Sequence, residues 1–231
     1  MEIKNLNFSH NKKEIFNNLN IHFLDNKINT VIGPIGVGKS TLLDILSGLY
    51  SDKVNKDNII GFPSSNNIIY KLQHNPFFSE LTVSQTLKMF RKMDLNNNIF
   101  NSDIMNDIYS RILEPLKNKK MGVLSGGERQ VLFIYGICLL NRELYIFDEP
   151  FNEIDIYNID LMIEAINYLV KYRKKKVIIV LHQIEYLPKL STNIIFLNNK
   201  RCIFEGNIDS MFRTTNVNNI NDAFKLLEKL K

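Results

Sequence analysis

The chain reads Gly33-Pro34-Ile35-Gly36-Val37-Gly38-Lys39-Ser40 between an apolar run, residues 28–32, and a helical pattern that begins after Ser40. This spacing matches G-x-x-x-x-G-K-[ST] in the strand, loop and helix context that the motif requires. The glycines let backbone N–H groups close around phosphate oxygens, and the helix N-terminus adds positive partial charge. We expect Lys39 to reach the β- and γ-phosphates of a nucleotide, and the Ser40 hydroxyl to bind Mg²⁺. The alternative, a chance glycine turn, leaves the flanking elements and the Lys-Ser pair unexplained.

Strand and helix patterns alternate along the rest of the chain. Short apolar runs predict strands at 67–72, 144–147, 177–181 and 194–197. Apolar residues recur at helical spacing in 42–49 and 156–172. This alternation predicts an α/β fold built on a sheet. The helical and more polar stretch 78–140 predicts a separate lobe, and residues 214–231 predict a C-terminal helix.

The composition indicates one globular domain. The 231 residues are 45% hydrophobic, which is enough for a sizeable core. No run of 18 apolar residues occurs, so another chain would have to supply any membrane span. The net charge is +5, and the lysines are spread along the chain. The densest basic cluster, residues 171–176, is interpreted as a solvated loop. We therefore expect no nucleic-acid partner. Cys138 and Cys202 form no C-x-x-C pair and give no support to a metal site.

Two carboxylates, Asp148 and Glu149, follow the apolar run 144–147. Such a strand places Asp148 at an edge of the sheet, where it can hold Mg²⁺. Glu149 beside it can polarise an attacking water as a general base. Paired acids after a strand can also simply cap the next helix. Together with the phosphate loop, the pair predicts a site that hydrolyses a nucleotide.

Residues 124–130 read LSGGERQ ahead of a long apolar helix pattern. The turn Ser125-Gly126-Gly127 at a helix N-terminus can bind an anion through its N–H groups and the helix dipole. It can equally be an ordinary serine cap followed by Glu128. The residues alone leave these two interpretations open.

These motifs resemble, over nearly the whole chain, those of the nucleotide-binding subunit of an ABC transporter. GPIGVGKST resembles its Walker A motif, LSGGERQ its signature and LYIFDEP its Walker B motif. The resemblance implies a single ABC ATPase domain, residues 1–231, with a RecA-like core, an N-terminal antiparallel β region and an α-helical subdomain. The implied core covers 1–77 and 141–213, the helical subdomain covers 78–140 and carries the signature, and the C-terminal helix covers 214–231.

The resemblance also implies roles for residues that would otherwise attract little notice. A single glutamine after a strand, such as Gln73, is usually a surface residue. A single histidine after an apolar strand, such as His182, is usually buried, with its hydrogen bonds made inside the protein. In the family pattern, Gln73 contacts Mg²⁺ and the attacking water, and His182 contacts the γ-phosphate. The implied catalytic residues are Glu149, His182 and Gln73, and the implied Mg²⁺ ligands are Ser40, Gln73 and Asp148. The implied ATP-binding residues are His10, Gly33, Pro34, Ile35, Gly36, Val37, Gly38, Lys39, Ser40, Thr41, Ser125, Gly126 and Gly127.

Some positions depart from the family pattern. His10 stands where an aromatic residue usually stacks on adenine, and imidazole stacks less well. Asn152 and Glu153 are bulkier than the residues that usually begin the D-loop, which affects communication across a dimer. Gln183 follows His182 in place of the usual aspartate. None of these changes removes the phosphate-binding or acidic residues, so we expect a subunit that hydrolyses ATP.

The resemblance implies an ATPase that uses ATP and Mg²⁺ and powers a membrane transporter. Its expected partners are an integral membrane permease and a second ABC ATPase subunit, as a homodimer rather than a heterodimer, at the cytoplasmic face of the cell membrane. The short C-terminal region favours a bacterial exporter or an efflux or peptide-immunity system. One alternative is a soluble ABC ATPase of the cofactor-assembly type, without a transmembrane partner. Another is a generic P-loop nucleotidase, whose activity would not depend on Ser125.

Overall fold

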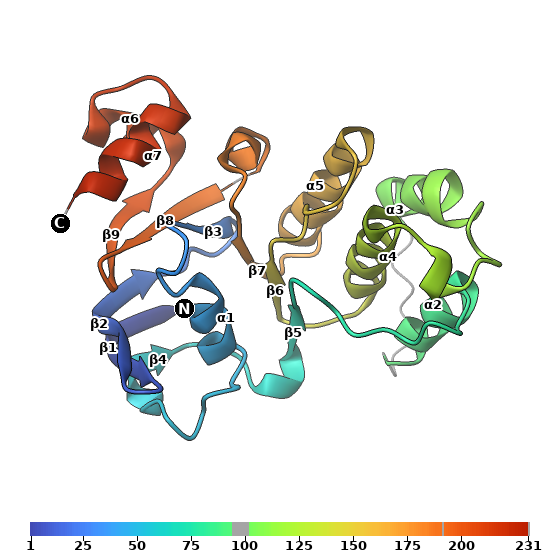
Figure 1. Ribbon diagram of the computed structural model, residues 1–231, viewed down its shortest axis with the longest axis horizontal. Coiled ribbons are helices and arrows are strands. Elements are labelled where there is room, and N and C mark those ends of the chain that lie inside the picture. The colour runs from blue at the N-terminus through green and yellow to red at the C-terminus, as the bar shows by residue number, and fades with distance from the viewer. Residues whose placement is uncertain (94–101, 191, 231) are drawn as a thin grey trace.

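The computed structural model describes residues 1–93, 102–190 and 192–230 and contains two sheets (Figure 1). The central sheet has six strands in the order β5 (Ile68–Lys71), β6 (Leu144–Asp148), β7 (Lys176–Val180), β3 (Ile28–Ile32), β8 (Thr192–Asn198) and β9 (Arg201–Gly206). The first five strands are parallel, and β9 is antiparallel to β8. This arrangement confirms the predicted α/β fold.

The central strands are apolar because both faces of the sheet are covered. Every residue of β3 and β6 is buried, and so are four of the five residues of β7. Such strands read as continuous apolar runs instead of alternating ones. Because neighbouring parallel strands run the same way, the loops after β5, β6, β7 and β3 all leave from the carboxyl end of the sheet. Polar residues at the ends of these strands therefore meet in space.

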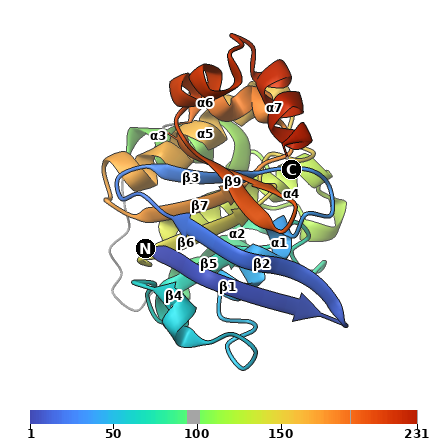
Figure 2. The ribbon, with the colours of Figure 1, turned by 90° about the vertical axis from the view of Figure 1, so that its left-hand side faces the viewer.

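An antiparallel sheet covers one side of this core. Its strands follow the order β2 (Lys13–His22), β1 (Glu2–His10) and β4 (Ile59–Ile60). Helix α1 (Lys39–Leu46) packs between this sheet and the central one, where Leu42 and Leu43 join the buried side chains of β1, β2 and β6. Figure 2 shows β1 and β2 as the outer layer on this side of the molecule. The predicted N-terminal antiparallel region is therefore present.

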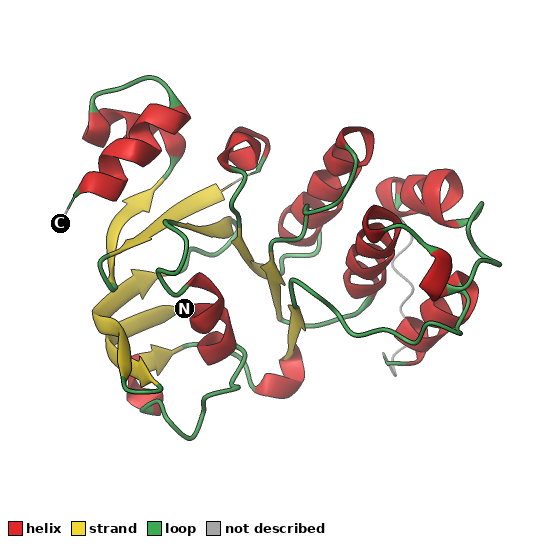
Figure 3. Ribbon diagram, viewed as in Figure 1, coloured by secondary structure: helices red, strands yellow, loops and turns green. Residues whose placement is uncertain are grey.

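A cluster of helices lies on the other side of the molecule, away from the antiparallel sheet (Figure 3). It contains α2 (Val83–Lys92), α3 (Asp103–Ile108), a π-helical turn (Tyr109–Leu113) and α4 (Gly126–Leu139). A capping box between Thr82 and Gln85 starts α2. Helix α5 (Ile156–Lys171) packs against both α4 and β7, and so joins the cluster to the central sheet. The lobe predicted at 78–140 corresponds to this cluster, apart from residues 94–101, which lie outside the described ranges.

The C-terminal region has a helix within the predicted range 214–231, and a second helix, which was not predicted, before it. It forms two helices, α6 (Ile208–Thr215) and α7 (Ile220–Lys229). Helix α6 is short: Met211 is buried, and Ile208 and Phe212 pack against the core beside it. Asn207 and Asn219 start the two helices by accepting backbone N–H groups of the first turn. Within the described ranges, no helix has the length and the apolar character needed to cross a membrane.

Candidate nucleotide-binding and hydrolysis site

The phosphate loop lies between the end of β3 and the start of α1. Gly33 has a φ of 146°, and a Cβ atom added to it would lie 2.2 Å from the carbonyl oxygen of Leu197 in β8. Only glycine fits this conformation and this close approach. Gly38, with a φ of 105°, is the residue before the first turn of α1. The N–H groups of that turn face the loop, as the motif predicts.

Lys39 folds back onto its own loop. Its side chain is buried, and its Nζ donates hydrogen bonds to the carbonyl oxygens of Gly33 at 2.8 Å and Pro34 at 3.0 Å. Burial lowers the pKa of Lys39, and the negative charges of Glu149 and Asp148 oppose that shift. The ammonium group thus lies inside the loop, where a phosphate group can replace the two carbonyl oxygens as its partner.

An open cavity of about 280 Å³ borders the loop. It is formed by the start of β2, the phosphate loop and the turn between β8 and β9, and its lining residues are 13–15, 34–37 and 198–200. Ile35 at the tip of the loop is 91% exposed. Ser40 and Thr41 follow in the first turn of α1. Of the predicted Walker A residues, those at 34–37 line this opening.

His10 lies at the end of β1 and does not line this opening. Its ring contacts Tyr50 edge-on, with ring centroids 5.7 Å apart, and Phe8 contacts the same tyrosine. Tyr50 was not among the predicted residues. It could not be found from the motifs, because it follows α1 in a loop with no pattern of its own. The assignment of His10 to adenine stays a prediction.

Asp148 ends β6, and only 4% of its surface is exposed. Burial raises the pKa of Asp148, and a hydrogen bond with Ser40 opposes this. Among the described residues, its Oδ1 atom is buried without a hydrogen-bond partner. An orphaned carboxylate oxygen beside a hydroxyl suits a hard cation that prefers oxygen ligands, such as Mg²⁺. The Gln73 amide can supply a third oxygen.

Glu149 is the centre of the site. Its Oε2 atom accepts hydrogen bonds from Gln73 Nε2 at 2.9 Å and from Asn152 Nδ2 at 2.5 Å. Its Oε1 atom lies 2.7 Å from His182 Nε2. The structure therefore brings together the three residues predicted to be catalytic, from the loops after β5, β6 and β7. Asn152 was not among the predicted site residues, although the family resemblance placed it at the start of the D-loop.

The backbone at Glu149 explains how one carboxylate reaches so many partners. Glu149 has a φ of 45°, in the left-handed region that non-glycine residues seldom adopt. Its N–H group donates to the carbonyl oxygen of Val180 at 3.1 Å, and so extends the pairing of β6 with β7. The turn then directs the side chain across the ends of β5 and β7. A non-glycine residue in this conformation is commonly found at functional sites.

The signature turn starts α4. The Ser125 Oγ atom accepts from the N–H of Glu128 at 3.1 Å, and the Ser125 N–H donates to Glu128 Oε2 at 2.7 Å. Ser125 is therefore an N-cap of α4, as one of the two interpretations of this turn predicted. The N–H groups of Gly126 and Gly127 lie in the first turn of the helix. Figure 1 shows α4 on the far side of β5 and β6 from α1. The signature therefore does not join the phosphate loop of its own chain.

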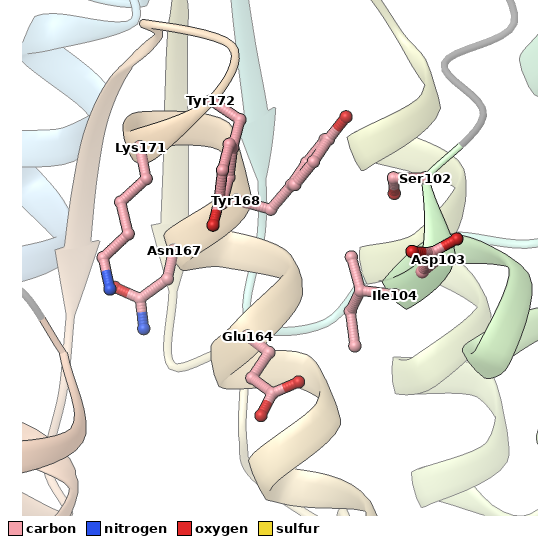
Figure 4. Close-up of a pocket in the computed structure, with 8 residues that line it drawn as sticks. All are labelled: Ser102, Asp103, Ile104, Glu164, Asn167, Tyr168, Lys171 and Tyr172. Atoms are coloured by element: carbon pink, nitrogen blue, oxygen red, sulfur yellow. The ribbon is translucent and has the colours of Figure 1, made fainter.

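A second cavity, of about 580 Å³, lies between α3 and α5 (Figure 4). The stacked rings of Tyr168 and Tyr172 form part of its wall. Its remaining lining residues are Ser102, Asp103, Ile104, Glu164, Asn167 and Lys171. None of them belongs to a predicted motif, and the cavity lacks the glycine loop and carboxylate pair that a nucleotide requires.

Comparisons with known proteins agree with this geometry. The zinc import ATP-binding protein ZnuC of Ehrlichia canis is 27% identical over 201 residues, which cover 86% of this chain and 80% of that protein. The petrobactin import ATP-binding protein YclP of Bacillus subtilis is 28% identical over 233 residues, which cover 96% of this chain and 92% of that protein.

Solved structures share the fold. The ATP-binding subunit of an ABC transporter superposes with a TM-score of 0.79 at 19% identity, over 99% of both chains. An ATP-binding cassette with bound ADP and phosphate superposes with a TM-score of 0.70 at 20% identity, over 90% of this chain and 98% of that one. The family model described as "ABC transporter" matches residues 16–152, more than half of the chain. The chain therefore belongs to the ABC transporter family, as an ATP-binding subunit that hydrolyses ATP.

Proposed function

We propose that the chain powers the import of a metal ion or a metal chelate through a membrane permease. The observation that carries the ATPase part of the proposal is the contact of Glu149 with both Gln73 and His182. The cargo is inferred from relatives whose names are zinc import and petrobactin import ATP-binding proteins. The short C-terminal region, which favoured an exporter, does not distinguish exporters from importers, because this chain covers 92% of the length of the petrobactin import protein YclP.

In this proposal the phosphate loop, residues 33–41, wraps the ATP phosphates, and Lys39 exchanges its loop carbonyls for phosphate oxygens. Ser40, Gln73 and Asp148 supply the oxygens that hold Mg²⁺. When bound, Mg²⁺ neutralises charge on the β- and γ-phosphates. His182 is the proposed contact to the γ-phosphate.

Glu149 is the proposed general base. Its Oε2 atom accepts from Gln73 and Asn152, and its Oε1 atom lies against His182, so an attacking water has to compete with these partners for the carboxylate. Gln73 and His182 would turn toward Mg²⁺ and the γ-phosphate when these are bound, which would leave the Glu149 carboxylate to polarise water. Hydrolysis thus follows a rearrangement of side chains, as in many enzymes gated by loop movements.

The proposed active assembly is a homodimer. The helix-start N–H groups of Gly126 and Gly127 suit the γ-phosphate chemically, yet they lie on a lobe away from their own phosphate loop. A second copy, turned about a two-fold axis, would bring its signature to that phosphate. The permease would place the pair at the cytoplasmic face of the cell membrane.

Co-purification tests the partner. The tagged chain is recovered from native membranes in mild detergent, and the proteins that accompany it are identified. A stoichiometric multi-span protein supports the transporter, and loss of zinc or iron-chelate uptake after deletion of this chain supports import. Recovery of soluble partners alone would favour the cofactor-assembly alternative.

A further inference from the structure

Glu153 lies in the loop between β6 and α5, and its side chain reaches the start of the signature helix α4. A Cβ atom added to Gly126 would overlap the Oε2 atom of Glu153 and lie 2.8 Å from its Cδ atom. A Cβ atom added to Gly127 would overlap the carbonyl oxygen of Glu153. The Glu153 carboxylate therefore occupies the space that a side chain at position 126 would need, and its backbone closes the space at position 127.

The start of α4 carries positive partial charge. The N–H groups of Gly126 and Gly127 belong to the first turn and have no acceptor within the helix. Ser125 accepts from the N–H group of Glu128, and the Glu128 carboxylate accepts from the N–H group of Ser125. Glu153 thus brings a second carboxylate to a helix start whose capping box already contains one.

A contribution to stability accounts poorly for this second carboxylate. Glu153 is exposed, and an exposed charge at a helix N-terminus stabilises the helix only weakly and is screened by salt. Glu153 also has a φ of 66°, in the left-handed region, which is unfavourable for a glutamate. The loop therefore adopts an unfavourable backbone conformation at the residue whose carboxylate lies against the signature glycines.

The γ-phosphate proposed to bind this helix start is also an anion. It would use the N–H groups of Gly126 and Gly127, and the Glu153 carboxylate already lies against Gly126. Like charges at such short range repel each other more strongly near a protein surface than in bulk water, because the effective dielectric constant is lower. ATP held by a second copy therefore has to displace the carboxylate or bind against its charge.

We propose that Glu153 is an autoinhibitory side chain, whose carboxylate lies over the signature of the nucleotide-free chain and weakens its binding to the ATP of a second copy. The inference rests on the homodimer proposed above and deepens it. It assigns to Glu153 the setting of the ATP concentration at which two copies close.

The test compares Glu149→Gln with the double variant Glu149→Gln/Glu153→Gln, in which glutamine keeps the length of the Glu153 side chain and removes its charge. Both full chains are titrated with Mg-ATP at one protein concentration, and the dimer fraction is measured by size-exclusion chromatography with light scattering. The double variant is expected to reach half-maximal dimer at an ATP concentration about tenfold or more lower. Added salt is expected to reduce this difference, because it screens the repulsion.

Glu149→Gln/Glu164→Gln is the matched control. Glu164 is an exposed residue of α5, so this variant has the same change in net charge and should need as much ATP as Glu149→Gln. Glu149→Gln/Glu153→Ala, which removes the carboxylate together with its stem, is expected to dimerise at least as readily as the double glutamine variant.

An ATP requirement that does not fall in either Glu153 variant, or that falls equally in the Glu164 control, would overturn the inference. If Glu149→Gln dimerises with ATP and the Glu153 changes have no effect, this inference fails alone and the homodimer stands. If no variant dimerises with ATP, the homodimer and the inference fail together. A dimer that forms only after Glu153 is changed would support both.

Discussion

Two glycines of one loop offer a test of how the phosphate loop is built. Gly33 and Gly36 have φ values of 146° and 79°, so alanine at either position is strained by its backbone, at a cost of about 1–3 kcal/mol. They differ in their surroundings. A Cβ on Gly33 would lie 2.2 Å from the carbonyl oxygen of Leu197, whereas a Cβ on Gly36 would meet no atom within 4 Å.

The difference between Gly33→Ala and Gly36→Ala therefore isolates the clash with β8. The obstacle at Gly33 is backbone of a central strand, which cannot rotate away, so we expect the overpacking penalty of about 1–3 kcal/mol in Gly33→Ala alone. For a domain of this size each kcal/mol lowers Tm by about 2–4 °C, so Gly33→Ala should unfold about 2–12 °C below Gly36→Ala.

The assay is thermal unfolding of the nucleotide-free protein in a metal chelator, followed by ATP titration of each variant. Gly33→Ala should also lose more ATP affinity, because relief of the clash moves the start of the loop. Equal Tm values for the two variants would refute the steric argument and would mean that the approach of Gly33 to Leu197 is not as close as the structure has it.

Three further predictions concern individual side chains. Glu149→Gln should keep ATP binding and lower kcat at least about 100-fold, because the amide cannot take a proton from water; the variant should form an ATP-dependent dimer in size-exclusion chromatography, and normal turnover would show that Glu149 is not the base. Asp148→Asn should raise Tm of the nucleotide-free protein at neutral pH while it abolishes Mg²⁺-dependent turnover. Because burial raises the pKa of Asp148, its charged form destabilises the native state, and the penalty disappears as pH falls through that pKa, so the Tm advantage should shrink as the pH is lowered from neutral into the acid range; a constant advantage would contradict this. His10→Tyr should lower the Kd for ATP in a calorimetric titration, whereas an unchanged Kd would argue against adenine stacking at position 10.

The sequence predicted the strands and helices that surround the site, but not the order of the strands. The contact between Gln73, Glu149 and His182 depends on β5, β6 and β7 being neighbours, and apolar runs of similar length carry no information about which strands pair. The family resemblance, and not the periodicity, indicated that these three residues share a site. Their roles in catalysis stay predictions.

Other features escaped sequence analysis for physical reasons. Lys71, the last residue of β5, is fully buried. In the sequence it is only a polar residue at the end of an apolar run, and its burial depends on the packing of α4 over β5. Asn152 lies in a loop, and its contact with Glu149 depends on the left-handed backbone conformation of Glu149, which the residue type does not predict. Helix α6 spans only eight residues, a length at which apolar spacing alone does not identify a helix. In each case the deciding information is a contact between segments that are distant in the chain or a backbone conformation.

The side-chain contacts of Glu149 come from the loops after β5, β6 and β7, and this spread bears on how the proposed ATPase is controlled. A subunit that meets ATP constantly would consume it without result if its base were always free. If Glu149 is the base, as proposed, an attacking water has to compete with partners on several loops. The contacts of the nucleotide-free protein would then restrain hydrolysis until those loops move.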